Sequence, residues 1–409
     1  MQQFKQVAMV PGNPKYDQAV ARKRELYTRS DDLRSPFFRD YTRILHCNAY
    51  RRLKHKTQVF YATSGDHVCT RMEHVQHVAS ICYSLAQGMG LNSELAQAIA
   101  LGHDLGHAPF GHQGEAILRR IVFRELGTQE NYWHERNSLR FVDSIETLPD
   151  PQGVEQNLNL TYGVRDGIIC HCGEVSDEAL LPREQGVDLA VMERPNQYAP
   201  WTWEGCIMKV ADKIAFLGRD LEDAVSLGIL SEDERRTLAR LLGRWLVGVN
   251  LANLPNTLLI NIFIRDLLLN STPEGGIRFS KDMLKFIHEL ASFSLKNIYN
   301  HPRLMPFLAY ATTMLEQLFS HLKRYYAGME TIRRLEDERP IYPELHGNFS
   351  SYLKKYSVMQ QTLDFTPNYG HITLYDLSQE RDYLQAIIDF LSGMTDHYAI
   401  KTFQELLQM

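Results

Sequence analysis

The sequence predicts a mostly α-helical protein with a helical core, a helical C-terminal extension and few short strands. Apolar residues recur every three or four positions over long segments, and clusters of Pro and Gly separate those segments. Of the 409 residues, 44% are hydrophobic, which is enough to bury a large core. Residues 56–61 are the best candidate for a strand.

The first clear helix spans residues 71–89, where the apolar residues form one stripe. Gly88 and Gly90 close this helix, as glycines at helix C-termini do, and Asn92 can cap the next helix, at 93–102. Further helices are expected at 112–126, 134–147, 160–171, 202–227, 231–250, 256–270, 280–300, 303–326 and 371–393. Predicted loops lie at 149–153, 182–200 and 272–276.

The composition excludes several classes of protein. The apolar content excludes a low-complexity disordered chain, and a net charge of −5 disfavours a nucleic-acid packaging protein. No run of about 18 apolar residues predicts a membrane span, and the polar N-terminus lacks the apolar core of a signal peptide. Six dispersed cysteines are typical of reduced thiols in a cytoplasmic protein. The run Cys170-His171-Cys172 lacks a second pair of ligands, which disfavours a zinc site there.

Charge and histidine are unevenly distributed along the chain. Residues 15–56 contain 12 Lys and Arg and 5 Asp and Glu, so this segment carries +7 and the remainder −12. Nine of the 16 histidines lie between His46 and His134. A basic run is most often a solvated surface, but basic residues beside a histidine cluster favour a pocket for an anionic, phosphorylated ligand.

Four residues on three predicted helices form a candidate metal site. His74 lies on the first helix, the pair His103-Asp104 ends the second, and Asp212 lies within 202–227. If the three helices pack side by side, the side chains of these residues can direct their metal-binding atoms toward a common point. Two imidazoles and two carboxylates suit an octahedral ion such as Mn, Fe, Mg or Ni better than zinc.

Residues 101–115 carry the strongest catalytic signal. They contain four glycines and three histidines, a poor composition for a core helix, and glycine lets a backbone approach a ligand closely. The helix that opens at 111–115 could face an anion with its N-terminus. Within it, His112 and Glu115 are one turn apart, the spacing of a proton donor and the carboxylate that orients it.

Several runs resemble the HD-domain deoxynucleoside triphosphate triphosphohydrolases, the dGTPase-like family. They are residues 35–44, 50–60, 70–74, 101–115, 158–161, 211–215 and 393–399. The HD pair alone would indicate only a metal phosphohydrolase, whereas the runs KTQVF at 56–60 and GHQGE at 111–115 narrow the resemblance to this family. Similarity is low between about 227 and 390.

The resemblance implies that water attacks the α-phosphorus of a dNTP and releases the deoxynucleoside and tripolyphosphate. It implies one divalent ion per site, with Mn favoured over Mg, Fe and Ni, held by His74, His103, Asp104 and Asp212. It also implies that His112 protonates the departing 5′-oxygen, that Glu115 holds its imidazole, and that His107 and His134 stabilise phosphate oxygens.

The resemblance further implies a set of substrate contacts. Arg71 and Lys213 would bind the triphosphate, and Gln58 and Asp220 would bind the sugar 3′-hydroxyl. Arg51 is a further candidate contact. Tyr299 and Phe216 are candidate pocket aromatics, with ordinary helix packing as the open alternative.

The predicted organisation has three parts. A basic segment at 1–60 contributes to the substrate pocket, 61–227 form the HD phosphohydrolase core, and 228–409 form a helical C-terminal region. By resemblance, the protein is expected to be a homo-oligomer, and a second dNTP as allosteric effector or single-stranded DNA as a secondary ligand stays open. Two other functions also stay open: another HD-domain nucleotidase or phosphodiesterase, and a non-catalytic nucleotide or single-stranded DNA sensor.

Overall fold

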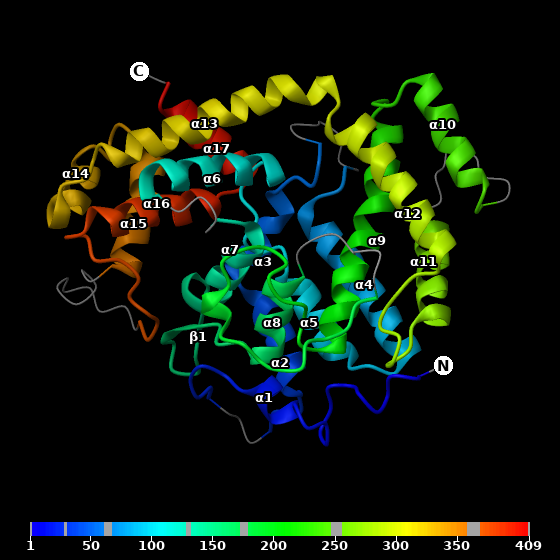
Figure 1. Cartoon of the computed structure of the whole chain (residues 1–409). Coiled ribbons are helices and arrows are strands. Elements are labelled where there is room, and N and C mark those ends of the chain that lie inside the picture. Colours follow the sequence, from blue (N-terminus) through cyan, green and yellow to red (C-terminus); the bar gives the residue numbers. More distant parts are fainter. Residues whose placement is uncertain are drawn as a thin grey trace.

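The computed structural model describes residues 2–27, 31–60, 68–127, 132–171, 179–246, 256–357 and 369–407. Within these ranges the chain forms seventeen α-helices and one sheet of two short strands (Figure 1). The prediction of a mostly α fold is therefore confirmed. None of the described helices is both long enough and apolar enough to cross a bilayer.

The elements of the first half of the chain begin with α1 (Tyr16–Val20), α2 (Pro36–His46), α3 (Asn48–Arg52), α4 (Arg71–Met89) and α5 (Ser93–Gly102). They continue with α6 (Gly111–Leu126), α7 (His134–Arg140), β1 (Thr147–Pro149), β2 (Glu155–Asn157), α8 (Tyr162–Cys170) and α9 (Trp203–Ser226). The strands are antiparallel, with Thr147 opposite Asn157.

The second half is helical. It contains α10 (Glu232–Gly243), α11 (Asn256–Asn270), α12 (Lys281–Ser294), α13 (Met305–Lys323), α14 (Thr331–Asp337), α15 (Pro343–Tyr356), α16 (Glu380–Ser392) and α17 (Asp396–Glu405). In Figure 1, α13 runs along the top of the molecule from the α12 side to α14.

Helices α4, α5 and α9 pack against one another at the centre of the molecule (Figure 1). Local sequence sets their ends. Thr70 and Glu73 form a reciprocal capping box at the start of α4, and Gly90 ends that helix in a left-handed conformation with φ of 85°. The side chain of Asn92 then caps α5, as the sequence predicts. This packing fixes the three backbones that carry the predicted metal ligands.

The C-terminal helices cover two sides of this core. Helix α11 packs on α4 and α9, whereas α13 and α16 pack on α6. The carboxylate of Asp396, at the start of α17, accepts hydrogen bonds from the backbone N–H of Phe110 (2.9 Å) and of Thr57 (3.0 Å). The buried ammonium of Lys56 donates to the carbonyls of His107 and Ser392. The C-terminal run 393–399 therefore anchors the loop that precedes α6.

Several predicted elements differ from the structure. No strand forms at 56–60, where Thr57 makes one isolated bridge to Thr70, and Tyr61 lies outside the described residues. The helix expected at 371–393 begins only at Glu380, because the preceding backbone pairs with Tyr356 instead. The helix expected at 134–147 continues past α7 as a π-helical turn, Phe141–Ile145, and the chain then enters β1.

Candidate metal centre and active site

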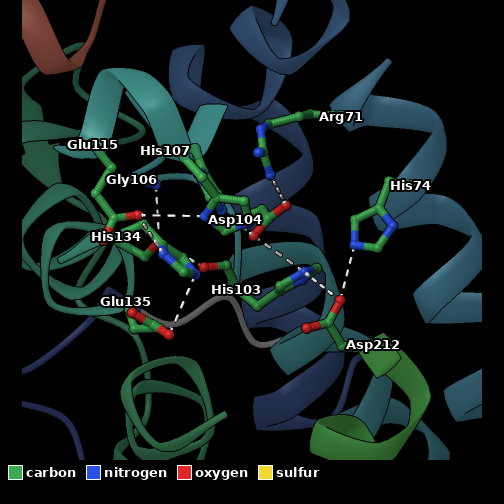
Figure 2. Close-up of polar contacts among 12 residues, drawn as sticks. Arg71, His74, His103, Asp104, Gly106, His107, Glu115, His134, Glu135 and Asp212 are labelled. Carbon is green, nitrogen blue, oxygen red and sulfur yellow. Dashed lines mark hydrogen bonds and ion pairs between the residues drawn. The ribbon is translucent and has the colours of Figure 1, made fainter. Parts of the chain in front are cut away.

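Three helices bring the four predicted metal ligands to one place (Figure 2). His74 lies in the first turn of α4, His103 and Asp104 follow α5, and Asp212 lies in α9. Nε2 of His74 is 2.9 Å from Oδ1 of Asp212. Nε2 of His103 is 3.3 Å from Oδ1 of Asp104 and 3.7 Å from Oδ1 of Asp212. Donor atoms of His74, His103 and Asp104 all lie within 4.8 Å of one another.

The state of the His103 ring fits a bound cation. Its Nδ1 lies 2.7 Å from the carbonyl oxygen of Ala100, which can only accept, so Nδ1 carries a proton. Its Nε2 is buried and has no hydrogen-bond partner among the described residues. In the neutral ring Nε2 bears a lone pair that faces the oxygens of Asp104 and Asp212. Acceptors that face each other repel unless a cation or a proton lies between them, so this donor set suits a divalent metal ion.

Both carboxylates of this set are ionised at neutral pH. Burial by itself raises the pKa of Asp104, but His103, His107 and Arg71 hold it well below its usual value. Burial also favours the neutral acid at Asp212, whereas the hydrogen bond with His74 and the electrostatic effect of the neighbouring His103 imidazole hold its pKa at about 2. The pair therefore carries the negative charge that a divalent cation requires.

A second group of side chains lies on the other side of Asp104 (Figure 2). Donor atoms of His107, His112, Glu115 and His134 are within 4.8 Å of one another. Nε2 of His107 is 3.1 Å from Oδ1 of Asp104, which links the two groups. The structure therefore brings the four predicted catalytic residues together next to the metal ligands.

The carboxylate of Glu115 lies closer to His134 than to His112. Its Oε2 is 2.9 Å from Nδ1 of His134 and 3.8 Å from Nδ1 of His112. The guanidinium of Arg119 donates to its other oxygen at 2.7 Å. The side chain of His112 is 72% exposed, so its ring is open to a ligand from solvent.

His134 is a strongly basic imidazole in the second group. Burial lowers its pKa, but the carboxylates of Glu135 and Glu115 outweigh burial and raise the pKa to about 9. Burial raises the pKa of Glu135 to about 7, against the opposing charge of His134. Burial would also raise the pKa of Glu115, but His134 and His112 hold it well below its usual value. His134 and Glu115 are thus an imidazolium and a carboxylate at neutral pH.

Glycines in the loop after α5 serve packing between backbones. A Cβ added to Gly106 would lie 2.0 Å from the backbone nitrogen of Ser138, and one added to Gly114 would lie 1.8 Å from the carbonyl oxygen of Pro109. The sequence analysis expected these glycines to let the backbone approach a ligand. At Gly106 and Gly114 they instead let two segments of the protein backbone approach each other.

Arg71 is the substrate-binding candidate that lies directly at the centre. It is 1% exposed, and its Nη1 donates to Oδ2 of Asp104 at 2.7 Å. Its Nε and Nη2 are buried without a hydrogen-bond partner among the described residues. A guanidinium with unused N–H groups beside the metal ligands is suited to an anionic ligand.

The other substrate-binding candidates occupy different environments. Tyr299 donates a 2.5 Å hydrogen bond to Oδ2 of Asp220, and burial raises the pKa of Asp220 to about 7 against that bond. Oε1 of Gln58 is buried and has no partner among the described residues. Lys213 is buried within α9. The remaining two candidates are Phe216, which is half-buried against the core, and Arg51, which is exposed on α3.

Cations of the basic N-terminal segment are largely used within the protein. Arg22 bonds Asp40 and the carbonyl of Asn159, and Arg43 donates to the carbonyl of Leu158. Arg52 pairs with Glu146. These cations tie the N-terminal segment to the rest of the chain, whereas Arg71, outside that segment, bonds Asp104 at the histidine cluster.

Two residues at the centre were missed by sequence reasoning. His171 follows α8 and is buried; its ring centroid lies 5.0 Å from that of His103 and 5.7 Å from that of His134. Burial and the neighbouring His103 imidazole lower the pKa of His171 to about 3. Glu135 lies next to His134, with Oε1 3.3 Å from its Nε2. The sequence signal that could have indicated His171 is its position beside Cys170 at the end of a buried helix. Cys172 lies outside the described residues.

Comparisons with known proteins agree with this geometry. A family model described as HD domain matches residues 71–217, the part of the chain from α4 into α9. A deoxyguanosinetriphosphate triphosphohydrolase-like protein of Desulfatibacillum aliphaticivorans is 32% identical over 377 residues, which cover 91% of this chain and 88% of that protein. The chain belongs to this family of HD-domain proteins.

Other members of the dGTPase-like family show the same extent of similarity. A protein of that name from Caldanaerobacter subterraneus subsp. tengcongensis is 30% identical to this chain. The aligned region covers 92% of this chain and 86% of that protein. One from Caulobacter vibrioides is 32% identical, and the aligned region covers 92% of this chain and 91% of that protein. The chain is thus an HD-family hydrolase related to nucleotide triphosphohydrolases, with a His/Asp cluster that could hold a divalent metal.

Proposed function

We propose that the protein hydrolyses deoxynucleoside triphosphates to the deoxynucleoside and tripolyphosphate in a metal-dependent reaction. The observation that carries this proposal is the convergence of two groups on Asp104: a four-residue metal-ligand set on one side and a histidine–carboxylate group on the other. Family membership supports the proposal, because the relatives are named as deoxyguanosinetriphosphate triphosphohydrolase-like proteins.

The metal ligands in this proposal are His74, His103, Asp104 and Asp212. A bound divalent ion, with Mn favoured over Mg, Fe and Ni, would supply positive charge against the charge that develops on the α-phosphate. Arg71 would add fixed positive charge through the two N–H positions that the protein leaves unused. Lys213 is assigned to the triphosphate as well.

The proton donor in this proposal is His112. Its exposed ring faces solvent and can reach a leaving 5′-oxygen, and Glu115 at 3.8 Å is close enough to bias its orientation. His134, which is cationic at neutral pH, and His107, stacked on it at 3.9 Å, would stabilise phosphate oxygens. The charge on His134 stabilises an anion without a proton transfer.

The deoxyribose is assigned to Gln58 and to the pair Asp220 and Tyr299. The unpartnered Oε1 of Gln58 is an acceptor that a sugar hydroxyl would satisfy. Asp220, held by Tyr299, offers a second acceptor on the helix that carries Asp212. Arg51 stays a predicted substrate contact and Phe216 a predicted aromatic of the pocket. A homo-oligomer, a second regulatory dNTP, secondary single-stranded DNA binding and a cytoplasmic location also stay predictions.

The proposal is tested by product analysis. The purified protein is incubated with Mn²⁺ and each of the four dNTPs, with matched ribonucleotides, and the products are separated by ion-exchange chromatography. We expect tripolyphosphate and a free deoxynucleoside from at least one dNTP, and no tripolyphosphate after chelation of the metal or in a His103→Ala variant.

The product distinguishes the alternatives. Pyrophosphate or orthophosphate as the released species would replace the proposal with another HD-domain nucleotidase or phosphodiesterase. Tight binding of dNTPs without turnover of any of them, in protein that holds its metal, would favour a nucleotide sensor.

A further inference from the structure

The carboxylate of Asp396 joins two segments of the candidate active site that are distant in the sequence. Its Oδ1 accepts the backbone N–H of Phe110 at 2.9 Å, two residues before His112. Its Oδ2 accepts the backbone N–H of Thr57 at 3.0 Å and also the hydroxyl of Thr57, the residue before Gln58. One buried side chain of the C-terminal region therefore holds the backbone beside the assigned proton donor and beside an assigned sugar contact.

Asp396 is available for this role because another residue caps its helix. Asp396 opens α17, and an acidic residue in a first turn usually interacts with the N-terminus of its own helix. Here Oγ1 of Thr395 accepts the backbone N–H of Tyr398 instead. The two oxygens of Asp396 accept from backbone groups that lie 286 and 339 residues away in the sequence.

We propose that Asp396 is a positioning residue of the reaction, which fixes the backbones of His112 and Gln58 relative to each other. The inference rests on the proposed function, in which His112 protonates the leaving 5′-oxygen and Gln58 binds the sugar 3′-hydroxyl. Because these two groups act on the same deoxyribose, a fixed spacing between their backbones places both of them at once.

The backbone that precedes His112 requires support from other parts of the protein. Phe110 and Gly111 both adopt the left-handed conformation, with φ of 64° and 56°. A residue such as Phe seldom adopts that region, and the conformation persists where the surroundings hold it. The bond to Asp396 is one such support, and the ring of Phe110 packs edge-on against Phe307 of α13, with 5.5 Å between the centroids. The C-terminal helices therefore hold the turn that presents His112.

The two side chains that Asp396 positions are held weakly by their own contacts. Nδ1 of His112 is 3.8 Å from Oε2 of Glu115, which is beyond hydrogen-bonding distance, and the side chain is exposed. Oε1 of Gln58 has no hydrogen-bond partner among the described residues. The placement of both side chains therefore depends on the backbones that carry them, and these are the backbones that Asp396 bonds.

Lys56 supports the same junction from the residue before Thr57. Its side chain is 2% exposed and donates to the backbone carbonyls of His107 and Ser392. The same three parts of the chain are therefore bonded together at a second point.

The test variant is Asp396→Asn in the full-length protein. The amide matches the carboxylate in size but accepts through one end only, so one of the two backbone bonds is lost. We expect bound Mn²⁺ to stay at the wild-type content. We expect kcat for the preferred dNTP to fall by about 10- to 100-fold, because a displacement of about 1 Å at a reacting group costs up to about 10²-fold.

The matched control is Glu405→Gln on the same helix. The carboxylate of Glu405 also accepts two backbone N–H groups, those of Glu344 at 3.0 Å and Leu345 at 2.9 Å, but both lie at the start of α15. The change removes a bond of the same kind away from the site, so kcat and metal content should stay at wild-type values. Equal losses of kcat in the two variants, or loss of Mn²⁺ from Asp396→Asn, would reduce Asp396 to a structural anchor and overturn the proposal.

Thr57 gives a second readout, which does not depend on the folding of Asp396→Asn. Thr57→Val removes the hydroxyl that bonds Oδ2 of Asp396, whereas Thr57→Ser keeps it. The quantity measured is the ratio of kcat/KM for a dNTP to kcat/KM for the 2′,3′-dideoxynucleoside triphosphate, which lacks the 3′-hydroxyl. We expect this ratio to fall by about tenfold in Thr57→Val, the effect of one hydrogen bond, and to return to the wild-type value in Thr57→Ser.

The outcomes separate this inference from the proposed function. An unchanged ratio in Thr57→Val would overturn the inference. Wild-type protein that turns over no dNTP would remove the proposed function and this inference with it. Active wild-type protein in which Asp396→Asn and Glu405→Gln behave alike would remove this inference alone.

Discussion

Two clusters of buried histidines in the described part of the chain differ in their partners. At the centre, His103 and His171 anchor Nδ1 on the backbone carbonyls of Ala100 and Ile168, and a donor atom of each lies within 4.8 Å of one of Asp212. In the C-terminal helices, Nε2 of His321 is 2.8 Å from Nε2 of His346, so the two inward nitrogens bond each other.

The proton positions in the second pair follow from its neighbour. Arg324 can only donate, and its Nη2 lies 2.6 Å from Nδ1 of His321. The proton of that ring is therefore on Nε2, which donates to His346. The two Nε2 atoms of the pair and Nδ1 of His321 are thus bonded within the protein, whereas the central cluster leaves donors that converge. Convergence of free nitrogens with carboxylates, rather than the number of histidines, marks the functional site.

The largest expected effect comes from breaking the central cluster. His103→Ala should lower hydrolysis of the preferred dNTP by about 10⁴-fold, because the loss of a ligand removes several kcal/mol of transition-state stabilisation. Bound Mn²⁺ should fall in parallel. The checks are steady-state kinetics and metal content at fixed Mn²⁺ concentration.

The control for this change is His346→Ala in the second pair. It should leave kcat and metal content within about twofold of wild type. It should instead lower the free energy of unfolding by about 1–3 kcal/mol, since a buried hydrogen-bonded ring is lost and His321 is left without its partner. A large loss of activity in His346→Ala would erase the contrast between the two regions.

The next largest effect is expected at the exposed histidine of the central site. His112→Ala should retain the full metal content and lower kcat by about 10²- to 10³-fold, as removal of a general acid does. A substrate whose leaving group needs no proton, such as p-nitrophenyl triphosphate, in which p-nitrophenolate leaves in place of the deoxynucleoside, should lose much less. Near wild-type turnover of dNTPs by this variant would remove the proton-donor assignment.

A smaller effect is expected from the carboxylate that orders the second group. Glu115→Gln removes the anionic partner of His134 and should lower kcat by about 10- to 100-fold, the usual cost of losing such a partner. Glu125→Gln, on the same helix but paired with Lys323, is the matched control and should be close to wild type. Equal losses in both variants would indicate a general weakening of α6.

The smallest effect concerns pH and Asp220. Burial raises its pKa from about 3.9 in the unfolded chain to about 7 in the folded protein. Between these values the folded state binds more protons than the unfolded state, so this carboxyl makes the protein less stable as pH rises from about 4 to about 7. Asp220→Asn should flatten that slope and be relatively more stable above pH 7, as measured by urea unfolding at several pH values. An unchanged slope would contradict the raised pKa.

The sequence predicts most of the fold because its signals are local. The capping residues Thr70 and Asn92 and the glycine at position 90 set the ends of α4 and α5 as expected. The spacing of His103, Asp104, His107, His112 and Glu115 within one short segment also made a site there predictable. Local signals fail at 371–379, where the chain bonds to Tyr356 rather than to itself.

Residues that join the site through tertiary packing could not be predicted in this way. His171 reaches His103 only because α8 packs on α5, and no spacing in the sequence encodes that contact. The net charge of residues 15–56 likewise could not show that Arg22 and Arg43 form hydrogen bonds within the protein. The partners of these two side chains lie on a neighbouring helix or more than 100 residues away in the sequence.

The most direct test of the account is the position of the metal itself. In a crystal grown with Mn²⁺, anomalous scattering at the manganese absorption edge should give a peak bounded by His74, His103, Asp104 and Asp212, and none at the His321–His346 pair. A manganese peak at the C-terminal pair, or no peak at the central carboxylates of fully active protein, would contradict the claim that the converging donors around Asp104 are the metal centre.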